Sequence, residues 1–191
     1  MGAFKPLLPF GDRTVVESCI DYLRRGGVET IVVVLGHRDD DVRKQLADSL
    51  VRFAVNPDPT SEMSVSIACG VRELPEQTKA TLISPVDQPS IPSDVVMTLI
   101  NEWKTTSAKL IVPEYQGSGG HPVLVDLSFR EELLNLDSQR GLRAVFDAHR
   151  EEVHRVPVKS SFIARDLDTW DDYRALHLEV FGTEPPRTPP N

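Results

Sequence analysis

The segment ATLISPVDQP, residues 80–89, sets the expected fold of this chain. Its first four residues, Ala80–Ile83, form a short apolar run that predicts a buried strand. Asp87 follows this run after a Ser-Pro turn. In open α/β sheets, ligands bind beyond the carboxyl ends of the strands, so Asp87 is a candidate site residue. Acidic residues at such positions also cap turns and helices, and the segment alone leaves both interpretations open.

The rest of the chain alternates between strand and helix patterns. The run ETIVVVL, residues 29–35, is typical of a parallel strand buried on both faces. Further strands are predicted at 51–55, 109–112, 121–125, 153–158 and 163–167. Helices are predicted at 14–25, 39–50, 64–74, 92–103, 129–136, 141–149 and 169–181. Asp12 or Thr14 can cap the first helix, and Ser61 or Ser64 can start the third. This alternation predicts βαβ units and an α/β fold with a mainly parallel sheet.

The segments outside this pattern have clear compositions. Residues 1–11 contain two prolines and predict a loop whose Leu7, Leu8 and Phe10 pack inward. Residues 115–120, YQGSGG, predict a flexible loop. Residues 182–191 hold four prolines and predict a disordered tail, which leaves one domain over residues 1–181.

Composition narrows the classes of function. The 191 residues, 40% hydrophobic and 26% charged, suit one globular domain. A formal net charge of −8 argues against binding nucleic acid or an anionic membrane. Cys19 and Cys69 lack metal-ligand spacing and read as buried free thiols. No long apolar run or secretory signal is visible, so the expected compartment is the cytoplasm.

Three carboxylates are candidates for a metal site. A hard cation such as Mg²⁺ binds one or two carboxylates together with phosphate oxygens, which Asp87 and the pair Asp166 and Asp168 could supply. Spacing alone favours a capping role for Asp168 or Thr169 at the last helix. Lys5 is either a solvated surface lysine, which is the simpler interpretation, or a lysine that reaches a phosphate.

Other candidates lie in loops and at helix starts. His121 follows glycines that permit close backbone approach, so it is either a strand-edge residue or a ligand contact. Arg140 and Arg143 open a helix, where positive charge opposes the helix dipole and favours an anionic partner. Met63 with Ser64 and Ser66 are by default core and cap residues.

These motifs, in this order, resemble the molybdenum cofactor cytidylyltransferase family over nearly the whole chain. They are MGAFKPLLP at 1–9, VVVLGH at 32–37, NPD at 56–58, MSVS at 63–66 with Gly70, DQP at 87–89, GHPV at 120–123, RGLR at 140–143 and DLDT at 166–169. The resemblance implies a three-layer Rossmann-like fold of the nucleotide-diphospho-sugar transferase type.

The resemblance also implies roles for particular residues. Asp87 would hold Mg²⁺ at the nucleotide phosphates, with Asp168 as second carboxylate and Asp166 in reserve. Lys5 would neutralise charge on the triphosphate and share the catalytic role with Asp87. The implied nucleotide- and cofactor-binding residues are Gly2, Lys5, Asn56, Met63, Ser64, Ser66, Gly120, His121, Arg140 and Arg143.

The implied reaction needs little acid–base chemistry. The terminal phosphate of a molybdopterin cofactor attacks the α-phosphorus of CTP, and pyrophosphate leaves. Because this nucleophile is already ionised, positioning and charge neutralisation supply the catalysis. CTP is preferred over GTP only on the MSVS pattern. A molybdenum hydroxylase is the implied client, and a non-catalytic cofactor carrier or insertion protein is the alternative function. A third, less favoured function is that of a nucleotidyltransferase for a sugar or isoprenoid phosphate.

The sequence departs from the family pattern in several places. Pro85-Val86 replaces a small Gly before Asp87, Gln139 stands where an acid is usual, and Glu62 replaces Gly. The first strand and most of the glycine-rich loop are missing. That strand is central in the family's sheet, so we expect two neighbouring strands with unpaired edges. Our hypothesis is that Met1 is an internal methionine of a longer reading frame.

Overall fold

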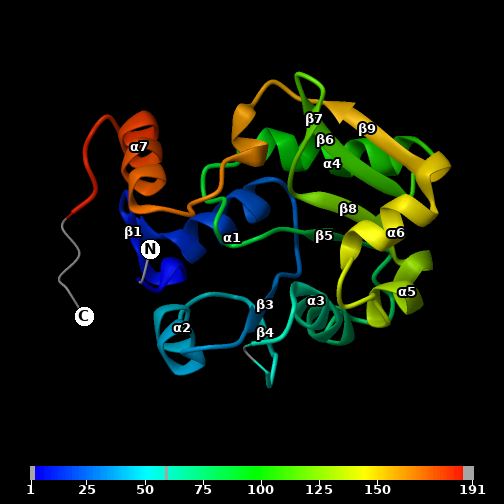
Figure 1. The fold of residues 1–191 in the computed structure, drawn as a ribbon, viewed down its shortest axis with the longest axis horizontal. Helices are drawn as coiled ribbons and strands as arrows, with labels where there is room; N and C mark the ends of the chain where they lie inside the picture. The colour runs from blue at the N-terminus through cyan, green and yellow to red at the C-terminus, as the bar shows by residue number, and fades with distance from the viewer. Residues whose placement is uncertain (1–2, 59, 187–191) are drawn as a thin grey trace.

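The longer strands form two separate sheets (Figure 1). The computed structural model describes residues 3–58 and 60–186. The larger sheet contains β5 (Ala80–Ile83), β8 (Val123–Asp126), β6 (Leu110–Tyr115), β7 (Ser118–Gly119) and β9 (Val153–Pro157). The smaller is the parallel pair β3 (Val32–Leu35) and β4 (Arg52–Val55). In the larger sheet, β8 is antiparallel to β5 and β6, while β9 is parallel to β6, so β5, β6 and β9 share one direction. The α/β class and the mainly parallel arrangement are confirmed.

Helices cover these sheets and connect their strands (Figure 1). They are α1 (Val15–Arg25), α2 (Asp39–Gln45), α3 (Met63–Arg72), α4 (Ser93–Thr105), α5 (Arg130–Leu134), α6 (Leu142–Ala148) and α7 (Trp170–Phe181), with short 3₁₀ turns η1 (Lys5–Leu7), η2 (Leu127–Phe129), η3 (Arg150–Glu152) and η4 (Ser161–Ala164). A two-residue hairpin, β1 (Pro9–Phe10) and β2 (Arg13–Thr14), precedes α1.

Reciprocal capping boxes start α1 and α7. Thr14 pairs with Glu17, and Thr169 pairs with Asp172, each side chain binding the other residue's backbone amide. Such boxes satisfy two amides that lack helical partners. Of the two cap residues predicted for α7, Thr169 takes the role, which leaves the Asp168 carboxylate for other contacts.

The structure differs from the sequence-based prediction at two helix ends, one strand and one loop. Helix α2 ends at Gln45, because Leu46 is the last buried apolar residue and Leu50 is 90% exposed. Neither Ser61 nor Ser64 caps α3, whose cap residue is Glu62. Residues 163–167 do not form a strand, since η4 occupies their start. The predicted loop at 115–120 is instead a tight β6–β7 hairpin.

The hairpin and the N-terminal segment have simple physical causes. Gln116 and Gly117 both have positive φ, the conformation of a two-residue turn that matches strand twist. At the N-terminus, Leu8 and Phe10 are 3% exposed and Leu7 is half-buried, which confirms that they pack inward. Residues 187–191 of the predicted tail lie outside the described residues.

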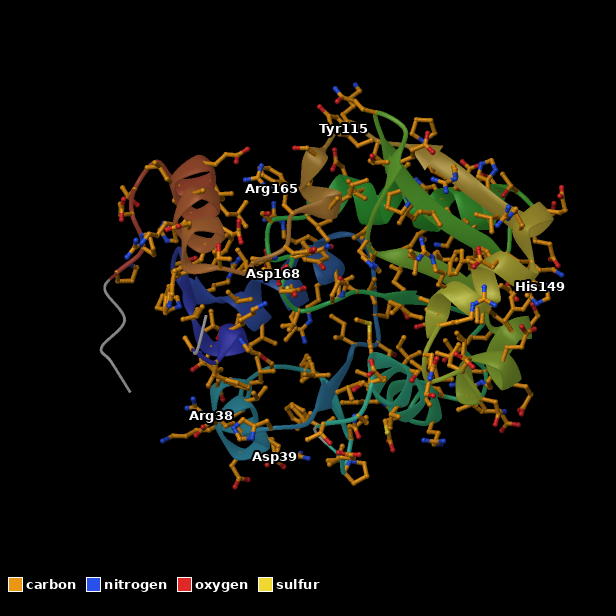
Figure 2. All side chains as sticks on the ribbon, in the orientation of Figure 1. Arg38, Asp39, Tyr115, His149, Arg165 and Asp168 are labelled. Carbon is orange, nitrogen blue, oxygen red and sulfur yellow. The ribbon has the colours of Figure 1, made fainter. Side chains whose placement is uncertain are left out.

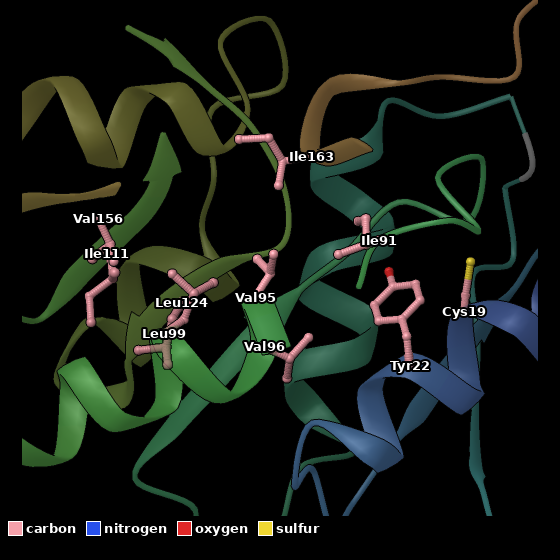
Figure 3. Packing of buried hydrophobic residues seen from close by; sticks show 10 residues of the cluster. All are labelled: Cys19, Tyr22, Ile91, Val95, Val96, Leu99, Ile111, Leu124, Val156 and Ile163. Atoms are coloured by element: carbon pink, nitrogen blue, oxygen red, sulfur yellow. The ribbon is translucent and has the colours of Figure 1, made fainter. Parts of the chain in front are cut away.

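The largest core cluster joins α1 and α4 to the larger sheet (Figure 3). Cys19 and Tyr22 come from α1, and Val96 and Leu99 of α4 are both fully buried. Leu99 lies on the side of Ile111 of β6, whereas Val96 lies on the side of Tyr22. This packing fixes α1 beside the loop that follows β5. None of the helices within the described residues is both long and apolar enough to cross a membrane.

The apolar strands β3 and β5 are less buried than their sequences predict. In β3 only Leu35 is fully buried, and all four residues of β5 are half-buried. Among the described residues, β3 pairs only with β4 and β5 only with β8, so each has one open edge. Burial of 29–35 on both faces is therefore wrong, whereas the expectation of two unpaired edges is confirmed.

The two cysteines are expected to differ in reactivity. Cys19 is buried, and burial raises the pKa of its thiol to about 12, whereas Cys69 is half-exposed. Because the thiolate is the reactive form, a thiol reagent at pH 8 should modify one group quickly in the native protein and two after unfolding. Ellman's reagent measures this count. Fast labelling of a Cys69→Ser variant in the native state would contradict the assignment of Cys19.

Candidate functional site

Lys5 lies between two carboxylates at the carboxyl end of β5. Its Nζ is 3.0 Å from Oδ1 of Asp168 and 3.8 Å from Oδ2 of Asp87. The lysine comes from η1, Asp87 from the loop after β5, and Asp168 from the segment before α7. Figure 2 shows Asp168 in the middle of the view, far from Arg38 and His149 at the periphery. Lys5, Asp87 and Asp168, all predicted site residues, therefore meet in space.

Backbone contacts hold Asp87 in place. The Leu167 amide donates to the Asp87 carbonyl (3.0 Å), and the Cys19 thiol donates to the Val86 carbonyl (3.4 Å). One turn further along α1, the Tyr22 hydroxyl hydrogen-bonds the Ser84 hydroxyl at 2.5 Å. The loop that presents Asp87 is thus tied both to α1 and to the segment that carries Asp168.

Asp166 belongs to the same cluster but has a different contact. Its Oδ1 accepts a hydrogen bond from Nε2 of Gln88 at 2.6 Å. The Gln88 side chain is buried, with 3% of its surface exposed. The other amide atom of Gln88, Oε1, is buried without a hydrogen-bond partner in the described part of the chain. A buried amide therefore orients Asp166, which sits close enough to Asp87 to affect its ionisation.

The electrostatics of the cluster favour an added cation. Burial raises the pKa of the Asp87 carboxyl above its ordinary value; the negative charge of Asp166 acts in the same direction, Lys5 opposes it, and Asp168 adds to it. The cluster thus holds three carboxylates and one lysine, which contacts two of them, Asp87 and Asp168. Among the described residues, no three His, Cys, Asp or Glu side chains form a ready-made metal cage. Two convergent carboxylates suit a cation that completes its shell with phosphate oxygens and water.

His121 and Gly120 form the wall beside this cluster. Burial lowers the pKa of His121, so its imidazole is neutral at pH 7. Its Nδ1 is buried without a hydrogen-bond partner among residues 3–58 and 60–186, which leaves one polar atom for a ligand. Gly120 packs on η4, and a Cβ there would lie 2.2 Å from the Ile163 carbonyl oxygen. The glycine therefore allows close packing, and its own ligand contact stays a proposal.

Asn56 organises the loop opposite Asp87. It is 5% exposed, and its Nδ2 donates to the hydroxyls of Ser61 (2.9 Å) and Ser66 (3.0 Å). Its Oδ1 accepts from the Asp58 amide (3.1 Å). The side chain of Asn56 is thus held by protein partners in the loop before α3, and its ligand contact stays a proposal.

Replacing Asn56 by alanine should destabilise the protein. The change removes three hydrogen bonds from a buried site and leaves their partners unpaired, so we expect the free energy of unfolding to fall by about 1–3 kcal/mol. Asn135, which is exposed and whose Nδ2 donates to the Glu131 carbonyl, is a matched control with a change below about 0.5 kcal/mol. Urea denaturation of both variants measures the difference, and equal losses would contradict it.

The remaining predicted residues are dispersed. Met63 and Ser66 line a cavity together with Asp87, His121 and Arg143. Ser64 is buried, with its Oγ unpartnered within the described chain. Arg140 does not line this cavity but pairs, at 2.7 Å, with Asp147, which does. Gly2 lies outside the described residues. The sequence did not predict the contacts of Cys19, Tyr22 and Gln88, because their partners lie more than sixty residues away along the chain. Of the three, only Gln88 belongs to a motif that the sequence singled out, DQP.

Comparison with known proteins shows the family of this chain. Residues 1–153 match the family described as the MobA-like NTP transferase domain. The chain belongs to the MobA-like NTP transferase family. It is 23% identical over 174 residues to the molybdenum cofactor cytidylyltransferase of Escherichia coli K12, covering 91% of this chain and 86% of that one. It is also 28% identical over 181 residues to the nicotine blue oxidoreductase of Paenarthrobacter nicotinovorans, covering 90% and 87%.

The solved structures agree with this placement of the MobA-like chain. The crystal structure of Rv0371c from Mycobacterium tuberculosis superposes with a TM-score of 0.83 at 25% identity, covering 93% of this chain and 90% of that one. The same protein has also been solved as a complex with manganese, at a TM-score of 0.79. A divalent cation is therefore present in a structure of a similar protein.

Proposed function

We propose that this chain is a divalent-metal-dependent nucleotidyltransferase that transfers CMP from CTP to the terminal phosphate of a molybdopterin cofactor and releases pyrophosphate. The observation that carries the proposal is the cluster of Lys5 between Asp87 and Asp168 at the end of β5. Such a cluster matches a reaction whose main demand is to neutralise phosphate charge. The resemblance to the cytidylyltransferase supports the choice of substrates.

Each residue of the cluster has a defined task in the proposal. Lys5 binds phosphate oxygens and offsets the charge that develops on the leaving pyrophosphate. Asp87 and Asp168 would hold Mg²⁺, with Asp166 in reserve, and a bound metal ion would supply further charge neutralisation at the phosphates. The oxygen of the cofactor's phosphate forms a bond to the α-phosphorus of CTP as the bond to the β-phosphate oxygen breaks. That phosphate is ionised near neutral pH, so no side chain needs to remove a proton.

The remaining assignments concern the substrates. His121, Met63, Ser64 and Ser66 would contact the pterin side of the cavity, with Arg143 meeting an anionic group. Arg140 would have to leave Asp147 to contact a ligand. CTP is preferred over GTP on the MSVS motif, and a molybdenum hydroxylase is the proposed client in the cytoplasm.

A pyrophosphate-release assay tests the proposal. Purified protein is incubated with Mg²⁺, molybdopterin cofactor and either CTP or GTP, and released pyrophosphate is measured with a coupled enzyme. Release that needs both CTP and cofactor supports cytidylyl transfer, whereas release with GTP alone as nucleotide reassigns the base. Tight binding of the cofactor without release from either nucleotide would favour the carrier function instead.

A further inference from the structure

We propose that Gln88 is a positioning residue whose buried amide fixes the Asp166 carboxylate beside Asp87. These two carboxylates then bind the divalent cation, and Asp168 stays paired with Lys5. The inference rests on the proposed function only for the use of a divalent cation. It refines that proposal, in which Asp168 is the second carboxylate and Asp166 the reserve.

The ion pairs of Lys5 distinguish the three carboxylates. Its Nζ lies 3.0 Å from Oδ1 of Asp168 and 3.8 Å from Oδ2 of Asp87, and it makes no such pair with Asp166. The lysine therefore offsets the charge of Asp168 most directly. A divalent cation gains more Coulomb energy beside a carboxylate whose charge is not already offset. The charges thus favour Asp166 over Asp168 as the partner of Asp87.

The hydrogen bond of Gln88 holds Asp166 without neutralising it. Nε2 of Gln88, a residue that is 3% exposed, donates to Oδ1 of Asp166 at 2.6 Å. A neutral amide fixes one carboxylate oxygen and leaves the negative charge of the group in place, which a lysine or arginine would not do. Carboxylates that bind metal ions are commonly oriented by such outer hydrogen bonds. The contact therefore suits a metal ligand.

The amide of Gln88 has one orientation that fits its neighbours. Its Oε1 is buried without a hydrogen-bond partner in the described part of the chain. Turning the amide over would place this acceptor against the carboxylate of Asp166, which also only accepts. A buried carbonyl without a partner costs stability. Gln88 therefore does more to place Asp166 than to stabilise the fold.

The backbone brings Asp166 and Asp87 together. Leu167 follows Asp166, and its amide donates to the Asp87 carbonyl at 3.0 Å, while its side chain is fully buried. Gln88 follows Asp87, so the two segments are joined by a main-chain bond and a side-chain bond. Burial is the main cause of the raised pKa of Asp87; the charge of Asp166 comes next, and that of Asp168 is the smallest cause. Asp166 thus interacts with Asp87 more strongly than Asp168 does.

A double-mutant cycle on Mn²⁺ affinity tests the inference. The electron paramagnetic resonance signal of free Mn²⁺ is followed while the ion is titrated into the protein, so no turnover is needed. Gln88→Met keeps the shape of the side chain but cannot donate a hydrogen bond, and we expect about tenfold weaker Mn²⁺ binding. In an Asp166→Asn background the same change should alter the affinity by less than about twofold, whereas in an Asp168→Asn background the loss should stay about tenfold.

Gln45→Met is the matched control. Gln45 is an exposed glutamine at the end of α2, and its Nε2 donates to Oε1 of Glu17 at 3.0 Å, away from the cluster. Its replacement should leave the Mn²⁺ affinity within about twofold of wild type. Urea denaturation shows whether each variant is folded. If Gln88→Met does not fold, Asp166→Asn alone carries the test, since it should weaken Mn²⁺ binding about tenfold and more than Asp168→Asn does.

Several results would overturn the role of Gln88. They are an equal loss of affinity in both backgrounds, a loss that disappears only with Asp168→Asn, wild-type affinity in folded Gln88→Met protein, an equal loss in Gln45→Met, and no Mn²⁺ binding by wild type. Pyrophosphate release judges the transferase separately. Release combined with wild-type Mn²⁺ affinity of Gln88→Met would remove the inference and leave the transferase, and the expected cycle without release would do the reverse.

Discussion

Replacing Asp87 by asparagine is expected to lower the rate of pyrophosphate release by about 10²–10³-fold. The amide keeps the shape of the side chain but removes the negative charge that would hold a divalent cation beside the phosphates. Because burial and Asp166 disfavour the ionised form of Asp87, the free energy of unfolding should not fall. Loss of activity without loss of stability separates a role at the site from a structural one. Initial rates and urea denaturation measure the two quantities.

Asp171→Asn is the matched control for Asp87. Asp171 is an exposed carboxylate in the first turn of α7, only three residues from Asp168, and it contacts Arg174 at 3.9 Å. Its neutralisation should leave the rate within about twofold of wild type, because it has no contact with Lys5. A similar loss of rate in both variants would mean that overall charge, and not the position of Asp87, controls the reaction.

Replacing Lys5 by alanine is expected to reduce the rate about 10²-fold. The change removes the cation that lies between Asp87 and Asp168 and leaves the cluster with negative charge where an anionic substrate must bind. Stability should change by only about 0–1 kcal/mol, because the ion pairs of Lys5 are partly exposed to solvent. Steady-state kinetics at several CTP concentrations would show whether the loss falls in KM, in kcat or in both.

Lys44→Ala serves as the control for Lys5. Lys44 is an exposed lysine in the last turn of α2, away from the cluster, so its loss should leave the kinetics unchanged. If Lys5→Ala also retained the wild-type rate, the lysine would be an ordinary surface residue, which is the simpler interpretation of its sequence context.

Local patterns predicted the elements whose causes are local. Strand β5 has the bounds that its apolar run predicts, and Thr14 and Thr169 cap helices because each has an acid three residues later. The β6–β7 hairpin was not predicted, because Gln116 gives no sequence signal for a positive φ. Burial of β3 was also wrong, since whether its apolar residues are covered depends on a neighbouring strand and not on its own sequence.

The candidate site was also predicted only in part from the sequence. The residues alone left the role of Asp87 undecided and favoured an ordinary surface role for Lys5 and a capping role for Asp168. Only the order of the family motifs predicted that the three form one site. The contacts that hold them, such as Tyr22 with Ser84 and Gln88 with Asp166, join segments far apart in the chain. The hydrophobic periodicity of the sequence does not predict such pairs, because they form only when helices and loops pack on the sheet.

The most direct test of the proposed activity compares wild type, Asp87→Asn and Asp171→Asn in one assay of pyrophosphate release from CTP with Mg²⁺ and molybdopterin cofactor. We expect release that requires the metal and the cofactor, a rate at least about 10²-fold lower for Asp87→Asn, and no change for Asp171→Asn. Release by Asp87→Asn at the wild-type rate, or no release by wild type with either CTP or GTP, would contradict it.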